Sequence, residues 1–229
     1  MEKCIVCNSK EVNLLSNNFW WYIDYFSIYG CTKCFSHFIN PELINNQIYD
    51  NIYNWNLNKW YDRYRYYYNN IWNHQSPIER LSKQESVYAL VREHIKNKSK
   101  NIKILEIGCG LWYLTYALNS SWFQCTWVDI SKVVIEKAKS KFWDYYIHND
   151  IENIIEKYDI IIATEVIEHV SDPNSFINLC LKNITKDGTV LVTTPNKNFW
   201  NKRSIWWNDL PPVHMSWITE SWMKLLADN

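Results

Sequence analysis

The segment from Ile102 to Trp112 constrains the fold of this chain more than any other part of it. A short apolar run, Ile102-Lys103-Ile104-Leu105, is followed at once by Glu106-Ile107-Gly108-Cys109-Gly110 and then by a helical pattern. α/β proteins build nucleotide pockets from a buried strand that ends in a glycine turn and leads into a helix. The tight turn lets a ligand approach bare backbone, and the next helix presents its N-terminal N–H groups. We therefore expect a nucleotide-binding α/β domain.

Strands and helices are expected to alternate along the rest of the chain. Strands are predicted near residues 102–107, 123–128, 144–148, 158–163 and 188–194. Helices are predicted near residues 112–119, 131–141 and 173–183, after an earlier helix over 78–98 with apolar residues at three-to-four spacing. This alternation is typical of a Rossmann-like, doubly wound and mostly parallel sheet.

The glycine turn resembles motif I of the class I S-adenosylmethionine (SAM) methyltransferases, in which an acidic residue precedes alternating glycines. Glu106 lies two places before Gly108, which favours SAM over NAD. The NAD pattern G-x-G-x-x-G would instead need its third glycine at Tyr113. The resemblance implies that Gly108, Cys109 and Gly110 lie against the methionine end of SAM.

Two further strand ends are candidate parts of the cofactor site. Asp129 ends the second predicted strand, where its carboxylate is expected to accept both ribose hydroxyls, with Ile130 beside it. The alternative is that Asp129 only caps the helix that begins near Ser131. Asp150 ends the third strand, and the resemblance implies that it contacts the adenine amino group, with Ile151 beside the ring. A simple turn role for Asp150 competes with this interpretation.

Residues 158–170 form an apolar strand followed by a polar loop that contains Glu165, Glu168 and His169. In the resembling family this strand end, often E-x-x-E-H, borders both the methionine moiety of SAM and the acceptor. The resemblance therefore implies that Glu165 binds cofactor and that Glu168 and His169 are catalytic. His169 is a candidate general base with a pKa near neutrality, or else the pair only orients the loop. Further on, His214 is expected either to meet the acceptor or to lie on the surface.

The N-terminal segment carries two C-x-x-C pairs, Cys4–Cys7 and Cys31–Cys34. Each pair can fold as a knuckle that points two thiolates at one ion, and two knuckles complete a tetrahedral shell. Four thiolates suit zinc, and a closed shell indicates a structural site. Reduced knuckles without metal, or iron in place of zinc, are the alternatives. His37 is expected to be a surface residue rather than a further ligand.

Charge and hydropathy narrow the partners and the location. The formal net charge is zero, which argues against nucleic acid or an anionic membrane as the main partner. Nothing resembles the N-P-P-[FYW] loop of nucleic-acid amino-methyltransferases. The sequence has neither a transmembrane stretch of about 18 apolar residues nor an N-terminal signal peptide. We expect a cytoplasmic protein whose cysteines stay reduced.

The chain contains few glycines and many tryptophans. It has 4 glycines, where average usage gives about 16, and 14 tryptophans. Several tryptophans stand where glycine is wanted, among them Trp112 at the third glycine of motif I, Trp122, Trp127 and Trp143. Some bacteria read the UGA codon as glycine, so we hypothesise that a translation reading UGA as tryptophan produced these residues. The alternative is a genuinely Trp-rich protein, in which the Trp112 indole would occupy space near the cofactor.

The resemblance covers residues 102–217 and implies an enzyme that methylates a small molecule such as a sugar, a polysaccharide precursor or a quinone-like compound. We predict a zinc-ribbon-like head over 1–40, an aromatic and Asn-rich connector over 41–77, and a methyltransferase domain over 78–229. Its sixth and seventh strands are expected to be missing, which would expose the edge of the fifth strand to association. The competing hypothesis is a non-catalytic zinc-ribbon and Rossmann-like binding protein.

Overall fold

The computed structural model of the 229-residue chain divides into two compact units. The parallel-sheet unit comprises residues 46–164 and 179–193, and the cysteine unit comprises residues 1–45, 165–178 and 194–229. The structure describes residues 2–21, 24–40, 47–54, 62–141, 146–147, 151–197 and 211–227.

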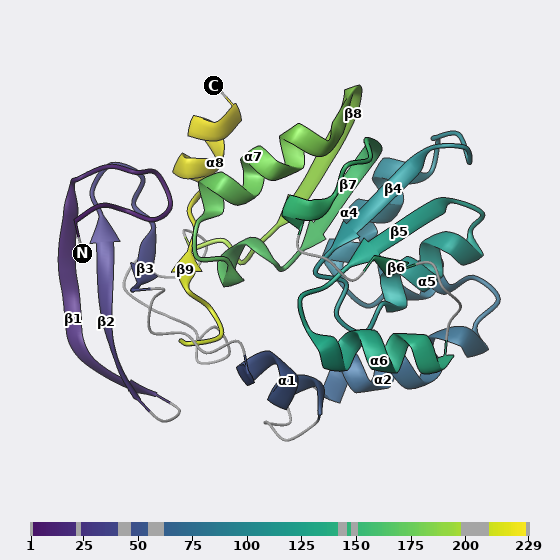
Figure 1. Ribbon diagram of the computed structural model, residues 1–229, viewed down its shortest axis with the longest axis horizontal. Coiled ribbons are helices and arrows are strands. Elements are labelled where there is room, and N and C mark those ends of the chain that lie inside the picture. Colours follow the sequence, from purple (N-terminus) through teal and green to yellow (C-terminus); the bar gives the residue numbers. More distant parts are fainter. Residues whose placement is uncertain are drawn as a thin grey trace. The chain divides into compact units, whose positions relative to one another are not determined.

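Five parallel strands form the sheet of the parallel-sheet unit (Figure 1). They are β4 (Lys103–Ile107), β5 (Gln124–Val128), β6 (Tyr146–Ile147), β7 (Tyr158–Thr164) and β8 (Ile184–Thr193). Their order is β6-β5-β4-β7-β8, so the chain runs outward from β4 to one edge and then returns to build the other side. This order confirms the predicted doubly wound, Rossmann-like α/β fold.

The helices of this unit precede the sheet or connect its strands (Figure 1). They are α1 (Gln47–Tyr53), α2 (Asp62–Asn70), η3 (Ile71–Asn73), α3 (Pro77–Ser82), α4 (Ser86–Ile95), α5 (Tyr113–Ser120), α6 (Lys132–Lys141), η4 (Ile151–Asn153) and α7 (Pro173–Asn183), whose first half belongs to the cysteine unit. The helix predicted over 78–98 is in fact two helices, α3 and α4. Glu85 has an extended backbone, with φ −138° and ψ 139°, so one continuous helix cannot pass through it.

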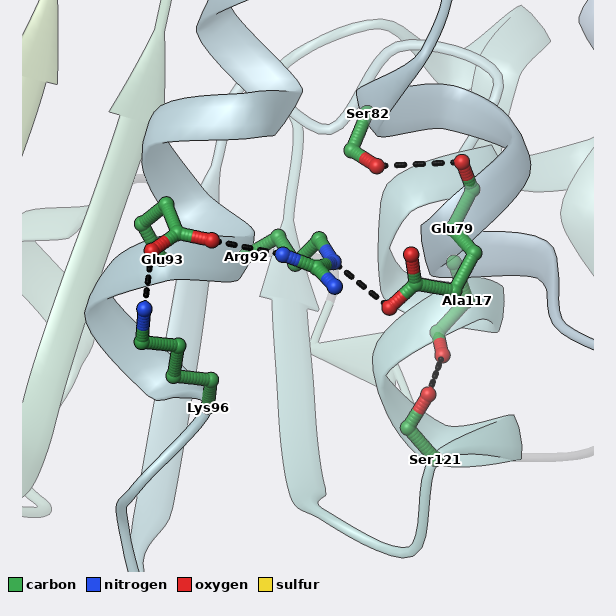
Figure 2. A network of polar contacts seen from close by, with 7 residues as sticks. All are labelled: Glu79, Ser82, Arg92, Glu93, Lys96, Ala117 and Ser121. Carbon is green, nitrogen blue, oxygen red and sulfur yellow. Dashed lines mark hydrogen bonds and ion pairs between the residues drawn. The ribbon is translucent and has the colours of Figure 1, made fainter.

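One ion pair connects α3 and α4 across this break, and further polar contacts lie within each helix (Figure 2). Arg92 Nε donates to Glu79 Oε1 at 2.5 Å, and Ser82 Oγ donates to the Glu79 carbonyl at 3.0 Å. Arg92 also bonds Glu93, whose other carboxylate oxygen accepts from Lys96. Because the charged groups are partly exposed to solvent, these ion pairs contribute little to the stability of the fold.

The core of the parallel-sheet unit explains why its strands read as unbroken apolar runs. The central strands β4 and β7 are covered on both faces, and Ile104, Leu105, Ile161 and Ile162 are fully buried. A cluster of aromatic side chains fills the space beside them, including Trp112 and residues of α2, α4 and α5.

Four antiparallel strands form the sheet of the cysteine unit, in the order β1-β2-β3-β9 (Figure 1). They are β1 (Val12–Trp21), β2 (Asp24–Cys31), β3 (His37–Ile39) and β9 (Ser216–Trp217), and the unit also contains η5 (Ile167–His169) and α8 (Glu220–Ala227).

The strand β9 joins the N-terminal sheet from a distant part of the sequence. His37 pairs with Trp217, and the Ile39 amide donates to the Met215 carbonyl at 2.9 Å. Met215 and Trp217 pack with Phe26, Ile28 and Ile39 in a small apolar core. The predicted division at residues 40 and 77 remains a prediction, but the compact unit that contains the head also includes later segments.

Within the described part of the chain, no helix combines the length and apolar character needed to cross a bilayer.

Candidate functional site

The glycine turn after β4 has the backbone geometry that its sequence predicts. Gly108 and Gly110 both lie in the left-handed region, with φ of 65° and 51°, where residues with a Cβ are strained. The Gly108 amide donates to the Val128 carbonyl at 2.9 Å, which holds the turn against the end of β5. A Cβ at Gly110 would lie 3.1 Å from the Tyr53 hydroxyl, so α1 approaches the turn closely.

Asp129 connects this turn to the start of α6. Its Oδ2 accepts from the Gly110 amide at 3.0 Å, and its Oδ1 accepts from the Ser131 amide at 2.8 Å. The capping interaction expected as the alternative is therefore present, and each oxygen keeps a lone pair for a ligand hydroxyl. Burial raises the pKa of Asp129 to about 6.

Glu106 supports the turn from within the sheet. Its side chain is buried and accepts a hydrogen bond from the Thr115 hydroxyl on α5. Burial raises the pKa of Glu106 to about 8, although the Thr115 bond lowers it. Cys109 is also buried, and burial raises the pKa of its thiol, so this residue is a neutral packing group in the turn.

The remaining residues predicted to bind cofactor follow other strands. Ile130 is exposed directly after Asp129, and Ile151 is buried at the start of η4. Asp150 lies outside the described residues. Glu165 directly follows β7 and has a left-handed backbone with φ 55°, a conformation that residues other than glycine rarely adopt.

Trp112 does not fill the glycine turn with its indole. It precedes α5 with φ 46° and ψ 19°, and its side chain is 1% exposed. The ring stacks on Trp127 at a centroid distance of 6.2 Å and meets the Tyr68 ring edge-on at 5.3 Å. The indole is thus part of the core. Trp122 is also left-handed, with φ 67°, but it is 83% exposed.

Glu168, His169 and His214 form a compact group in the cysteine unit. One ligand atom from each residue lies within 4.8 Å of the others. His169 Nδ1 is 2.6 Å from the Val213 carbonyl oxygen, and the His169 and His214 rings meet edge-on at 4.6 Å. Burial lowers the pKa of His169 to about 4 and that of His214 well below its usual value, so both imidazoles are neutral at neutral pH. The near-neutral pKa expected for His169 is not found.

The four predicted cysteine ligands also converge. Their Sγ atoms lie within 4.8 Å of one another, with Cys4 and Cys34 at 3.8 Å and Cys7 and Cys31 at 3.5 Å. The residue after each pair is left-handed, Asn8 and Phe35 both having φ 59°. A hydrogen bond with Cys4 lowers the pKa of Cys34. The two knuckles thus have matching backbone geometry.

Comparison with known proteins is consistent with this arrangement. The family model described as a methyltransferase domain matches residues 77–229. The chain belongs to this methyltransferase family. The doubly wound sheet and its glycine turn are the class I form of the fold, as the sequence resemblance implies.

Curated relatives of this methyltransferase domain include two ubiquinone biosynthesis O-methyltransferases. The protein from Proteus mirabilis (strain HI4320) is 30% identical over 105 residues, which are 42% of this chain and 43% of the relative. The one from Coxiella burnetii (strain Dugway 5J108-111) is 32% identical over 117 residues, or 48% and 49% of the two chains. The chain therefore spans about half the length of the curated relatives it matches.

Solved structures similar to this methyltransferase domain include coclaurine N-methyltransferase bound to N-methylheliamine and SAH. It aligns with a TM-score of 0.49 at 19% identity and covers 61% of this chain and 45% of that chain.

Sequence reasoning missed the residues of α1 that meet the turn. Tyr53 approaches Gly110, and Asp50 Oδ1 accepts from the Ser131 hydroxyl at 2.8 Å. The only signal in the sequence was the aromatic character of the connector, which does not say which of its residues meets the turn.

Proposed function

We propose that the protein transfers a methyl group from SAM to a small-molecule acceptor. The observation that carries this proposal is the bond between Asp129 and the Gly110 amide. It joins a left-handed glycine turn to a buried carboxylate at the carboxyl ends of adjacent parallel strands, where α/β sheets bind ligands.

The proposed roles follow the strand ends in order. Gly108, Cys109 and Gly110 are proposed to lie against the methionine end of SAM, with Glu106 supporting the turn. Asp129 would accept the ribose hydroxyls beside Ile130. Three further residues complete the proposed cofactor set: Asp150 at the adenine amino group, Ile151 beside the ring, and Glu165 at the methionine end.

The proposed reaction is an in-line displacement at the methyl carbon. An acceptor oxygen, nitrogen or carbon forms the new bond as the carbon–sulfur bond of the sulfonium breaks, and SAH leaves with the electron pair. Because the leaving group is already activated, positioning supplies much of the catalysis. Glu168 and His169 are proposed to act on the acceptor, either by taking its proton or by orienting the loop.

The acceptor is proposed to be a sugar, a polysaccharide precursor or a quinone-like compound. The quinone-like option gains support from the names of the curated relatives, which are ubiquinone biosynthesis O-methyltransferases. The proposal puts the reaction in the cytoplasm and does not involve nucleic acid.

We also propose that Cys4, Cys7, Cys31 and Cys34 bind a structural zinc ion. Four thiolates at about 2.3 Å from a tetrahedral zinc lie about 3.8 Å apart, close to the Sγ separations of 3.8 Å between Cys4 and Cys34 and 3.5 Å between Cys7 and Cys31. Four neighbouring sulfurs in a mostly buried site require a cation once they ionise. The zinc would hold the start of β1 and the turn between β2 and β3 together.

The second candidate function is a non-catalytic binding protein. It is suggested by Trp112, which stands at the third glycine position of motif I, where its indole could occupy the cofactor's space. The buried position of the Trp112 indole weakens this alternative, because the ring packs on Trp127 and leaves the Gly110 amide bonded to Asp129.

Calorimetric titration with SAM and SAH tests the proposal. The purified protein should bind both, and Asp129→Asn should weaken binding at least about tenfold because the amide replaces one acceptor oxygen with a donor. Asp187→Asn, at an exposed position in β8, is the matched control and should bind like the parent. A folded parent protein that binds neither compound would favour the non-catalytic alternative.

A further inference from the structure

The group formed by Glu168, His169 and His214 has the donor set of a metal site. Glu168 and His169 are consecutive in η5, and His214 comes shortly before β9. All three belong to the cysteine unit, and their ligand atoms lie within 4.8 Å of one another. Two imidazoles and one carboxylate are the ligands that divalent transition metals take when they keep open positions.

Backbone hydrogen bonds set the orientation of two of the three residues. His169 Nδ1 is 2.6 Å from the Val213 carbonyl, which can only accept, so Nδ1 carries the proton and donates it. This tautomer directs the Nε2 lone pair to the side of Glu168, whose Oε1 lies 4.0 Å away. Histidines that bind metals usually donate their other N–H to a carbonyl or carboxylate in this way.

The main chain around Glu168 is fixed as well. Its carbonyl accepts from the Met215 amide at 2.8 Å, which joins η5 to the segment that carries His214. The Glu168 side chain is 1% exposed. A carboxylate buried to this extent is stabilised by a nearby cation.

His214 supplies an independent observation. Its side chain is 8% exposed, and its Nδ1 has no hydrogen-bond partner among the described residues. Burying an unpaired polar nitrogen costs free energy, and coordination to a metal would remove that cost. The ring meets His169 edge-on with an interplanar angle of 87°, so the two imidazoles are not stacked, and their ligand atoms lie within 4.8 Å of each other.

We propose that Glu168, His169 and His214 bind one divalent transition-metal ion, such as Mn²⁺, Fe²⁺, Co²⁺ or Zn²⁺. Ligands about 2.1 Å from a common ion lie about 3 to 4 Å apart, so these side chains need to close by about 1 Å. Three protein ligands leave open coordination positions for water or a bound molecule.

The open positions indicate what the ion does, a step that rests on the proposed function. An acceptor hydroxyl bound to the ion has a lowered pKa and releases its proton to water, which leaves an oxygen nucleophile for methyl transfer. The ion then replaces His169 as the group that activates the acceptor. This restricts the acceptor to molecules that offer an oxygen to the metal.

Manganese separates this site from the four cysteines, because Mn²⁺ prefers oxygen and nitrogen ligands over thiolates. The full chain is loaded with one Zn²⁺ per molecule, which the four thiolates take first, and excess zinc is removed. It is then titrated with Mn²⁺ in the absence of SAM, and electron paramagnetic resonance measures the free ion. We expect one Mn²⁺ per chain with no loss of zinc, and electron spin-echo modulation from imidazole nitrogen. Glu168→Gln and His214→Gln should each weaken Mn²⁺ binding at least about tenfold, and His74→Gln should not.

Two results would overturn the proposal. One is a parent protein that binds no Mn²⁺, and the other is binding without nitrogen modulation or with unchanged affinity in the folded variants. If a variant does not fold, the nitrogen modulation of the parent protein alone decides the question. Because no SAM is present, failure of the proposed methyl transfer would leave this result intact.

Discussion

Single tryptophans in left-handed positions give the most direct test of the glycine hypothesis. A non-glycine residue in this conformation destabilises the folded state by about 1–2 kcal/mol. Glycine avoids this strain, but its more flexible unfolded chain offsets about 0.5–1 kcal/mol of the gain. Trp122 is exposed, so Trp122→Gly should raise the free energy of unfolding by up to about 1 kcal/mol. Urea denaturation measures this change.

Trp112→Gly is the matched comparison, because it has the same backbone conformation but a buried ring. Removing a large buried aromatic side chain costs about 3–5 kcal/mol, which exceeds the relief of strain. This variant should therefore lower the free energy of unfolding by about 2–4 kcal/mol. A gain in stability would instead show that the turn is built for glycine, as the codon hypothesis requires.

The raised pKa of the Glu106 carboxyl predicts that the stability of the protein depends on pH. Its pKa in the folded protein is about 8, above the ordinary value of 4.5, because burial disfavours the charged form. The unfolded chain therefore ionises first, and stability that is complete below about pH 4.5 is lost as the pH rises to about 8. The Glu106→Gln side chain stays neutral, so the variant should lose less stability than the parent across this range. The difference between the two losses should be on the order of a few kcal/mol. Parallel pH profiles for the two proteins would disprove the assignment.

At the scale of elements, the proposed zinc ion should hold the N-terminal sheet together. The apolar core of that sheet has few members, so metal ligation is expected to supply much of its stability. Removing zinc with a chelator should speed hydrogen exchange at the Ile39 amide, which donates to Met215 across β3 and β9. The amide of Ile161, fully buried in β7, serves as the internal reference. Equal protection with and without zinc would contradict a structural role.

The central parallel strands were predictable because β4 and β7 are buried on both faces and read as apolar runs. β8 is the exception at its start, since it begins at Ile184 rather than near residue 188. Its first residues include Lys186 and Asp187, and its register with β7 is irregular between Tyr158 and Ile160. Such polar residues at the start of a strand carry no apolar pattern.

The pairing of β3 with β9 was not predictable. The strand β9 has two residues, which is too short for any periodic pattern, and about 180 positions separate it from its partner. The same limit applies to Tyr53, whose contact with Gly110 depends on how α1 packs. By contrast, the convergence of the four cysteine side chains could be predicted from the sequence. Two C-x-x-C knuckles favour one common ion, and this preference does not depend on how the strands pair.

At the scale of the whole molecule, segments from both ends of the chain complete the cysteine unit. Thr219 donates its hydroxyl to the Cys34 carbonyl, and Asn174 Nδ2 donates to the Val6 carbonyl at 2.7 Å. Both C-x-x-C knuckles are therefore bonded to residues that lie inside the span matched by the methyltransferase family. Zinc affinity should consequently depend on residues far from the cysteines in sequence.

Trp217→Ala tests this dependence in the full chain. Trp217 is buried in the core of the N-terminal sheet and pairs with His37, so its loss should cost about 3–5 kcal/mol within that unit. The weakened sheet holds the cysteines less rigidly, and zinc should transfer to a chromogenic chelator at a lower chelator concentration. Leu225→Ala, on the partly exposed side of α8, is the control and should change little. If both variants release zinc like the parent, the two C-x-x-C knuckles form an independent head, as the sequence alone suggested.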